Sequence, residues 1–496
     1  MIAGLIFSFF LCVACLKADC FLQLCGYRAE AGFWRYFKSR HFFLSAVFFL
    51  FNLAVFIWAS EVFYFVCFVS IVILASFYFF ESKKTPFKLT KRARRLLATQ
   101  FVLCLVASCV FIPTTFLLIP FIVLLSNAIN KPFEFLINRT FIEEAKIKLK
   151  NYPQLKIIGI TGSYGKTSVK NILYALLKEK YKVIKTPESF NTPMGIVKTI
   201  NAENFENVDF FICEMGARKK GDINEICEIL KPDISIVTGI APQHMETFKT
   251  MENLIETKSE IILNTVKDGT VFFNNDCEFC REMAKNCDKK HCICGQNCSD
   301  FAWEKASLSS DGTRFEFNSK NQKFVFKTKL LGLHNVSNIC LCAAVAYFTG
   351  LNGEEIARGV EKLEFSPHRL QFIEGNGLYI LDDSYNANID GIRQSAEVLK
   401  LFEKRKFAIV SGIVEGGKTE EKLNEEVGKI FAEVCDAVFL VGKNSCHIKR
   451  GMSEIGYPSS KIVMCQSTED AVSALRCWAE RGDVVLFSND LPDNVI

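Results

Sequence analysis

The sequence lacks a strong excess of charge of either sign. It contains 59 Lys and Arg residues against 54 Asp and Glu residues, and the net charge of +5 is too small to indicate a nucleic-acid partner. After about residue 150 it also lacks internal repeats and low-complexity tracts, which excludes a repeat architecture there. Phenylalanine is abundant instead, with 47 copies in 496 residues, concentrated in the first third of the chain. A chain of this length holds roughly two to four domains.

One stretch, KIIGITGSYGKTSVK at residues 156–170, has the pattern of a phosphate-binding loop. The apolar run Ile157–Ile160 predicts a buried strand, and Val169–Leu177 predicts a helix. A glycine loop between a strand and a helix offers backbone N–H groups, and the positive end of the helix dipole, to phosphate oxygens. We expect this role for Gly162, Ser163, Gly165, Lys166, Thr167 and Ser168.

Two residues of this loop have the chemistry of an ATP site. Lys166 would reach the outer phosphates, and the Thr167 hydroxyl would bind Mg²⁺. The spacing departs from the common GxxxxGK[ST] pattern, because Ile160 stands where the first glycine would be. The alternative is an ordinary strand–turn–helix with a surface lysine. The position of Gly-Lys-Thr at the predicted helix start favours the ATP site.

The first part of the chain, residues 1–133, is predicted to be a helical transmembrane region. Two of its apolar blocks approach the length needed to cross a bilayer of about 30 Å. The first block lacks the basic start and the cleavage site of a signal peptide, so we interpret it as a retained anchor, with a re-entrant or cleaved segment as the alternative. The four blocks are Ile2–Leu16, Phe42–Trp58, Val62–Phe80 and Phe101–Leu125.

The charges of the loops predict the orientation of these blocks. Residues 16–41 and 81–98 contain five and seven Lys and Arg residues, whereas the turn Ala59–Glu61 contains none. The positive-inside rule therefore assigns the two basic loops to the cytoplasm. The block Phe101–Leu125, which contains Pro113 and Pro120, is either one kinked span or a hairpin. A hairpin returns the chain to the cytoplasm, where ATP is, and we favour it. The basic loops are also candidates for contact with anionic lipid headgroups.

From residue 153 onward, strands alternate with helices, as in a parallel α/β sheet. Residues 134–152 are expected to form an amphipathic connector into this part. A break at Phe365-Ser-Pro-His368 divides the remainder into two domains, 153–367 and 368–496. We expect a P-loop-type parallel-sheet ATP-binding domain followed by a smaller, Rossmann-like α/β domain.

Several polar residues follow predicted strands, where open α/β sheets bind their ligands. Glu214 could bind Mg²⁺ opposite Thr167, and His244 could be a further metal or phosphate ligand. Lys258 lies in a helical pattern, where a solvated lysine is the ordinary interpretation. The side-chain amides of Asn335 and Asn338 stand at the start of a later predicted helix, where they either cap that helix or contact an adenine edge. The remaining candidates, from this helix start and the second domain, are Asn335, Asn338, Arg369, Asp383 and Asn386.

Together these residues resemble the Mur ligase family, the ATP-dependent amino-acid ligases of peptidoglycan synthesis. The resemblance covers about two thirds of the chain, and the order and spacing of six tracts make it specific. The tracts are ITGSYGKTS (160–168), EMGA (214–217), IAPQHMETF with TKSEII (240–248 and 257–262), LGLHNVSN (331–338), HRL (368–370) and DDSYNAN (382–388).

The resemblance implies a reaction and roles for the residues. ATP would phosphorylate a substrate carboxylate, and an amine would then displace the phosphate to form an amide. By resemblance, Lys166 binds the β- and γ-phosphates, while Thr167 and Glu214 hold one Mg²⁺. His244 and a carbamoylated Lys258 would hold a second. Asn335 and Asn338 would contact the adenine region, and Arg369, Asp383 and Asn386 would complete the nucleotide site when the domains close.

The resemblance also implies partners, namely a nucleotide-linked muropeptide (UDP-MurNAc-tripeptide) and the D-amino-acid dipeptide D-Ala-D-Ala. The usual family member has a soluble domain for the UDP end of its substrate, whereas this chain has membrane blocks in that place. A lipid-linked muropeptide is therefore an open alternative. The tract SGIVEGG (411–417) also differs from the family motif. We expect a multi-pass protein of the inner (cytoplasmic) membrane with its catalytic domains in the cytoplasm.

The 21 cysteines are scattered, and an ATP-dependent enzyme works in the reducing cytosol, so we expect free thiols. Residues 277–298 contain six of them, but only Cys277 and Cys280 have a zinc-site spacing, and we favour buried thiols over zinc.

Three functions remain open: a membrane-tethered peptide ligase, a related amide ligase with another acceptor, and a silent ATP-binding scaffold. Lys166 and the predicted ligands of both metal ions are all present, and a scaffold would not need them, so the sequence favours an enzyme.

Overall fold

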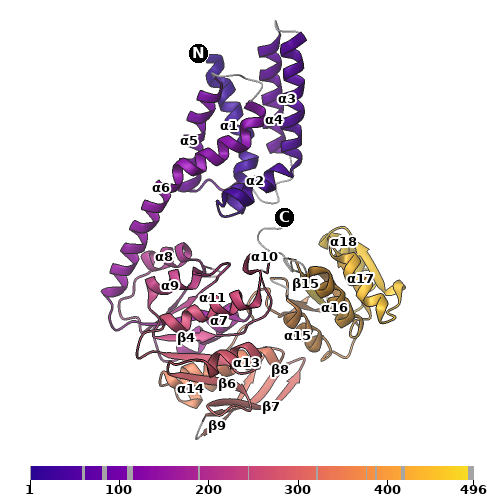
Figure 1. Ribbon diagram of the computed structural model, residues 1–496. Helices are drawn as coiled ribbons and strands as arrows, with labels where there is room; N and C mark the ends of the chain where they lie inside the picture. The colour runs from indigo at the N-terminus through magenta and orange to yellow at the C-terminus, as the bar shows by residue number, and fades with distance from the viewer. Residues whose placement is uncertain are drawn as a thin grey trace. The chain divides into compact units, whose positions relative to one another are not determined.

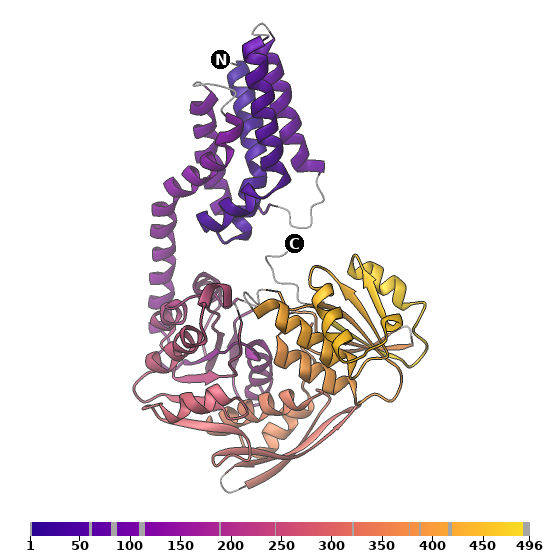
Figure 2. The same cartoon turned by 45° about the vertical axis from the view of Figure 1, so that its right-hand side comes forward.

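The computed structural model describes residues 2–58, 62–80, 87–108, 115–187, 190–243, 245–319, 322–375, 377–385, 388–414 and 419–489. The chain divides into two compact units, which meet between Thr140 and Phe141. We call them the helical unit and the ligase unit and describe each by itself (Figures 1 and 2).

The helical unit is built from apolar helices, as the sequence predicts. Among the described residues, three helices are long and apolar enough to cross a membrane: Ile6–Leu24, Arg40–Trp58 and Leu117–Lys150. Aromatic and aliphatic side chains such as Phe43, Phe51 and Phe65 remain exposed on its surface. The helices are α1 (Ile2–Leu24), α2 (Ala29–Phe37), α3 (Arg40–Trp58), α4 (Phe63–Phe80), α5 (Lys91–Ser108) and α6 (Thr115–Lys150).

The apolar block Phe101–Leu125 is divided between α5 and α6, as expected of a hairpin. The two helices are antiparallel, because Asn130 Nδ2 donates to Thr99 Oγ1 at 2.9 Å while Arg95, one turn earlier, pairs with Glu134 at 2.7 Å. The predicted connector is not a separate element, since its residues up to Lys150 continue α6. The first block is also longer than expected and extends to Leu24.

The ligase unit begins with a nine-stranded sheet in the order β2-β3-β1-β4-β5-β6-β7-β8-β9. Strands β2 to β7 pair in parallel, but β7, β8 and β9 form an antiparallel meander. In the sequence, the turn signal Asp311-Gly312 indicates only the hairpin of β7 and β8, so this extension is larger than that signal predicts. The strands are β1 (Lys156–Thr161), β2 (Val183–Lys185), β3 (Phe210–Glu214), β4 (Ile234–Val237), β5 (Thr270–Asn274), β6 (His291–Gln296), β7 (Phe301–Ser309), β8 (Gly312–Ser319) and β9 (Gln322–Thr328).

Helices cover both faces of this sheet. The side chains of central strands such as β1 are therefore buried on both sides. Ile158 and Ile160 pack with α7 and α13 in one hydrophobic core, whereas Ile157 packs with α8, α9 and α11 in another. The helices are α7 (Lys166–Leu177), α8 (Pro193–Ala202), α9 (Asp222–Leu230), α10 (Met245–Phe248), α11 (Met251–Asn264), α12 (Glu278–Lys285), α13 (Leu333–Phe348) and α14 (Gly353–Glu361).

A second, six-stranded sheet follows, in the order β10-β11-β15-β12-β13-β14. It is parallel except for the edge pair β10–β11, and this mostly parallel α/β arrangement agrees with the second domain predicted from the sequence. Its strands are β10 (Gln371–Gly375), β11 (Leu378–Asp382), β12 (Lys406–Gly412), β13 (Ala437–Val441), β14 (Ile462–Cys465) and β15 (Val484–Asn489), and its helices are α15 (Ile389–Leu399), α16 (Glu420–Ala432), α17 (Ser445–Glu454) and α18 (Thr468–Leu475).

Candidate active site

The glycine loop joins β1 to the start of α7, as the sequence predicts. Gly165 caps α7 with φ 78°, and Gly162 has φ 155°, both in the region that favours glycine. A Cβ on Gly162 would lie 2.2 Å from Thr238 Oγ1 and 2.9 Å from the Gly239 carbonyl oxygen. The loop is therefore held tightly against the end of β4, with the N-terminus of α7 beside it.

Lys166 folds back over the loop. Its Nζ donates to the carbonyl oxygens of Gly162 and Ser163 at 2.8 and 2.9 Å. Burial lowers its pKa to about 8, although Glu214 opposes this. Ser163 Oγ is buried and has no hydrogen-bond partner among the described residues. Both groups are thus positioned to exchange these loop contacts for those of a phosphate.

Glu214, at the end of β3, lies opposite Thr167, as expected. The Thr167 hydroxyl donates to Glu214 Oε2 at 3.0 Å, and Asn191 Nδ2 donates to Oε1 at 3.2 Å. The parallel pairing of Ile160 with Glu214 in β1 and β3 brings the two chain segments together. A hydroxyl and a carboxylate oxygen this close are suitable ligands for Mg²⁺.

A second lysine on α7, Lys170, also belongs to this cluster, and the sequence analysis missed it. Its Nζ lies 3.0 Å from Glu214 Oε2, and the two side chains are only 1% and 2% exposed. Burial alone would raise the pKa of Glu214, but Lys170 and Lys166 hold it below its usual value. Spacing of four residues from Lys166 was the one available signal, since it puts both lysines on the same side of α7.

Lys258 lies on α11 and is 3% exposed, so it is not the solvated lysine of the ordinary interpretation. Burial and the charge of Lys166 lower its pKa to about 7. A lysine that loses its proton this easily has a neutral amine for reaction with CO₂ near neutral pH. The other predicted ligand of the second metal, His244, lies outside the described residues.

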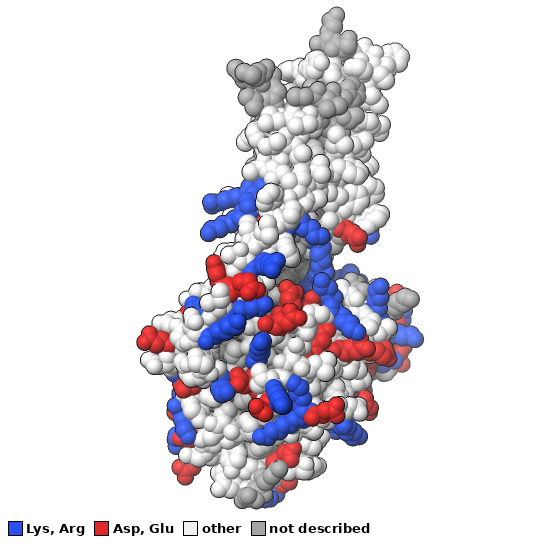
Figure 3. Space-filling view, turned by 60° about the vertical axis from the view of Figure 1, so that its left-hand side comes forward, with Lys and Arg blue, Asp and Glu red and all other residues white. Residues whose placement is uncertain are grey.

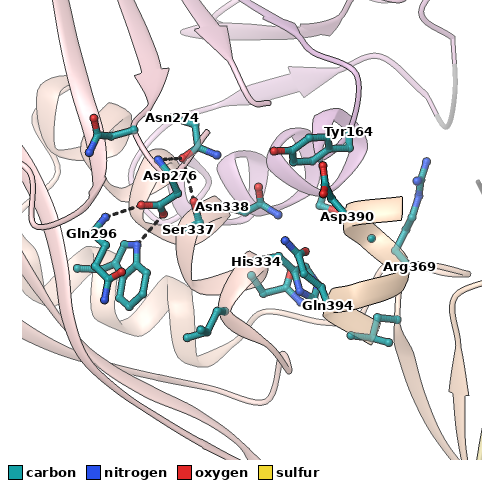
Figure 4. Close-up of a pocket in the computed structure, with 18 of the residues that line it drawn as sticks. Tyr164, Asn274, Asp276, Gln296, His334, Ser337, Asn338, Arg369, Asp390 and Gln394 are labelled. Carbon is teal, nitrogen blue, oxygen red and sulfur yellow. Dashed lines mark hydrogen bonds between the residues drawn. The ribbon is translucent and has the colours of Figure 1, made fainter. Parts of the chain in front are cut away.

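A cavity of about 450 Å³ adjoins the loop, and residues of both α/β domains line it (Figure 4). Six of the predicted nucleotide-binding residues are among those that line it: Gly165, Ser168, Asn335, Asn338, Arg369 and Asp383. The Arg369 guanidinium lies 3.9 Å from the Tyr385 ring centroid, and Asp383 accepts from the Leu370 amide and the Ser395 hydroxyl. Burial raises the pKa of the Asp383 carboxyl. Asn386 lies outside the described residues.

Other residues of this cavity were not predicted. Half-buried His334 lines it. Its Nδ1 is buried with no hydrogen-bond partner among the described residues, and desolvation lowers the pKa of the ring to about 4, so the ring is neutral at pH 7. Ser337 donates to Asn274 Oδ1, and the Trp303 indole donates to Asp276 at 2.8 Å (Figure 4). His334 and Ser337 stand inside the quoted tract LGLHNVSN. The others, which are Asn274 at the end of β5, Asp276 just after it and Trp303 in β7, stand where the sequence has no recognisable pattern.

The cysteines agree with the thiol prediction as far as the structure describes them. All 20 described cysteines are free, and within the described ranges no group of three His, Cys, Asp or Glu residues could hold a metal ion. Nothing in the part of the chain that is described therefore supports zinc at residues 277–298.

Comparison with known proteins shows the family to which the chain belongs. The chain matches the Mur ligase middle domain over residues 160–346, and the Mur ligase, glutamate ligase domain over residues 368–489. It is 30% identical to the UDP-N-acetylmuramoyl-tripeptide–D-alanyl-D-alanine ligase of Bacillus subtilis over 336 residues, which are 67% of this chain and 72% of that enzyme. The Escherichia coli ligase of the same name is 28% identical over 295 residues, 58% of this chain and 65% of that enzyme.

Solved structures show the same similarity. The MurF ligase of Thermotoga maritima, in complex with ADP, superposes with a TM-score of 0.64 at 28% identity, covering 71% of this chain and 80% of that one. MurF of Acinetobacter baumannii gives the same TM-score at 23% identity, with 71% and 77% coverage, and so shows the fold. The predicted resemblance is confirmed: the chain belongs to the Mur ligase family and is an ATP-dependent ligase.

Proposed function

We propose that this chain adds D-Ala-D-Ala to UDP-MurNAc-tripeptide in an ATP- and Mg²⁺-dependent reaction. The observation that carries this proposal is the joint presence, around one loop, of Lys166, the Thr167–Glu214 oxygen pair and the buried Lys258. The substrates follow from the names of the relatives in Bacillus subtilis and Escherichia coli, which both describe this dipeptide ligase.

The residues present fit a bound nucleotide. The hydroxyl of Ser163 and Nδ1 of His334 are buried and lack partners among the described residues, so each has a hydrogen-bonding position left for a ligand. Lys166 and the N–H groups at the start of α7 would bind phosphates, while Asn335, Asn338 and Asp383 would bind the nucleoside side of the cavity. Arg369 and Asn386 would complete the site from the second domain.

The described residues also fit one divalent cation, and we propose a second. Thr167 and Glu214 would hold one Mg²⁺ through their side-chain oxygens. A carbamoylated Lys258 and His244 would hold the other. Such ions offset negative charge as the phosphoryl group moves to the substrate carboxylate.

The protein's own contribution is to orient and protect the reactants. Lys166 and Arg369 supply fixed positive charge at the phosphates, in a buried site where each cation acts more strongly than in water. The cavity is lined by both α/β domains, so nucleotide held there would exclude water from the activated carboxylate until the amine of the dipeptide arrives.

We further propose that the helical unit crosses the inner (cytoplasmic) membrane several times, with the ligase unit in the cytoplasm. Three helices of suitable length and the cations between them support this. The number of spans, and the domain boundaries at residues 133, 152 and 367, remain predictions.

The test is ATP-dependent phosphate release by the detergent-solubilised full chain, with UDP-MurNAc-tripeptide and D-Ala-D-Ala and with product identified by mass spectrometry. We expect pentapeptide only when both substrates are present, and none from Lys166→Ala. Lys178→Ala is the matched control, because Lys178 is an exposed lysine that follows α7 directly. Release that requires a lipid-linked muropeptide instead would refute the proposed acceptor, and no release with any acceptor would leave a scaffold.

A further inference from the structure

Within its described residues, the helical unit carries its exposed positive charge towards one end. Residues 1–140 contain 14 Lys and Arg but 5 Asp and Glu, whereas residues 141–496 contain 45 and 49. In the described parts of α3, α4 and α6 up to residue 130, Lys and Arg are absent beyond the first residue of α3. On the face drawn in Figure 3, Lys and Arg side chains lie at the base of the helical unit, whose surface above them is largely uncharged where it is not grey.

Six exposed cations form what we call the basic rim: Arg28, Lys38, Arg40, Lys88, Lys91 and Arg94. They come from two segments far apart in the sequence, the turns around α2 and the start of α5. Gln23, near the end of α1, joins these segments, because its side chain accepts from the Lys88 amide and donates to the Lys88 carbonyl, both at 2.8 Å. The Arg92 guanidinium lies 3.8 Å from the Tyr27 ring centroid and adds a second contact.

Carboxylates do not neutralise this rim within the described residues. No ion pair is formed there by any of the six cations, while Glu134 is already engaged by Arg95. Lys91 and Arg94 also stand in the first turn of α5, which has no acidic residue, although the helix dipole disfavours cations at that end. Six unpaired cations repel one another, so an anionic partner from outside the chain would stabilise them.

The surroundings of the rim indicate the kind of partner. Trp34 and Phe37 on α2 are exposed beside it, 58% and 45%, and Trp34 has the amphipathic ring that is enriched at a membrane interface. On the same unit, apolar side chains such as Leu50 and Val102 are exposed along the helices. The exposed apolar side chains suit the acyl layer of a membrane, and the exposed aromatic residues suit its interface. The cations of the basic rim suit the phosphate headgroups that cover the acyl layer.

We propose that the basic rim binds the headgroups of anionic phospholipids, so that the helical unit selects phosphatidylglycerol over zwitterionic lipid around itself. This rests on the proposed insertion of the helical unit into a membrane, and it adds a lipid specificity that insertion alone does not require. Such a preference would hold the enzyme in lipid rich in negative charge.

The test uses the full chain with Trp58→Phe, reconstituted in phosphatidylcholine vesicles that contain brominated phosphatidylglycerol or brominated phosphatidylcholine. Bromine quenches nearby tryptophan, and Trp34 is then the tryptophan of the helical unit that reports on the rim. We expect about fivefold or stronger relative binding of phosphatidylglycerol, falling in 0.5 M NaCl. The variant R28Q/K38Q/R40Q should lower this ratio towards one, whereas K429Q/R450Q in the ligase unit should leave it unchanged.

Each outcome of this experiment either supports or overturns the proposed lipid preference. Equal quenching by the two lipids in the unaltered chain overturns the proposal, and so does a preference that survives in the triple variant. Loss of the preference on addition of inorganic phosphate without change of ionic strength assigns the rim to soluble phosphate groups instead. Absence of quenching by either lipid refutes membrane insertion itself, and phosphate release by the same sample shows separately whether the ligase is active.

Discussion

The buried ion pair between Lys170 and Glu214 gives the sharpest prediction of this structure. Replacing Lys170 by Met removes one partner of a pair in which both side chains are at most 2% exposed. The carboxylate of Glu214 would then be buried without its nearest cation. Breaking a buried pair from one side costs about 3–5 kcal/mol, because the remaining charge is desolvated and uncompensated.

The same reasoning predicts the opposite result when both partners are removed. In K170M/E214L the buried charge disappears together with its counter-ion, and an apolar pair of similar size takes its place. The double variant should therefore be more stable than K170M alone, by about 2 kcal/mol or more. Lys178→Met, an exposed change at the end of the same helix, should alter stability by less than about 0.5 kcal/mol.

Hydrogen exchange measured by mass spectrometry on peptides from β1 and β3 suits this cycle, because the full chain has several domains and does not unfold in one step. Mg²⁺-dependent binding of a fluorescent nucleotide gives a second readout, because Lys170 contacts Glu214 Oε2, the oxygen that also accepts from the Thr167 hydroxyl. We expect weaker Mg²⁺ dependence in K170M and partial recovery in K170R. The reasoning would be refuted if the stability effects of K170M and E214L simply added in the double variant, or if K170M cost less than about 1 kcal/mol.

Three further predictions concern the loop and its neighbours. Lys166→Met should lower the rate of ATP-dependent phosphate release by about 10²–10³-fold with unchanged melting, because it removes a cation from the phosphates. Gly162→Ala should destabilise the ligase unit by about 1–3 kcal/mol and weaken nucleotide binding, since its Cβ would lie 2.2 Å from Thr238 Oγ1; unchanged affinity by titration calorimetry would contradict this. The pKa of Lys258 is about 7 in the folded chain, so between pH 7 and 10 the unfolded state binds one more proton and stability should rise by up to about 1.4 kcal/mol per pH unit. Hydrogen exchange of α11 peptides, corrected for the intrinsic exchange rate, measures this rise, which should disappear in Lys258→Met.

Much of the site was predictable because its residues stand in short local patterns. The glycine loop needs two glycines, a lysine and a hydroxyl within seven residues, and its strand and helix follow from apolar spacing. Glu214 was predictable because it ends an apolar strand, and the parallel register of β1 and β3 then brings it to Thr167. Each of these features is recognisable from residues that stand close together in the sequence.

Lys170 and His334 could not be recognised in the same way. Whether a helical lysine is buried depends on what another part of the chain brings to it, here a carboxylate 44 residues later. His334 is a similar case, because its burial against the cavity results from the packing of α13 under the sheet. The β7–β9 meander also exceeds its short hairpin signal, since its strands are stabilised by pairing along their whole length rather than by the turn.

The small net charge of the whole chain conceals two opposite distributions, and these bear on function. The ligase unit has slightly more acidic than basic residues, yet its site contains the buried cations Lys166, Lys170 and Arg369 beside Glu214 and Asp383. Affinity for a polyanionic nucleotide therefore comes from cations fixed and buried at one site, where screening is weak, and not from the overall field of the unit. The helical unit has the reverse arrangement, with exposed cations at one end that salt screens readily. Raising the ionic strength should accordingly weaken lipid selectivity well before it weakens nucleotide binding, and a parallel loss of both would contradict this division.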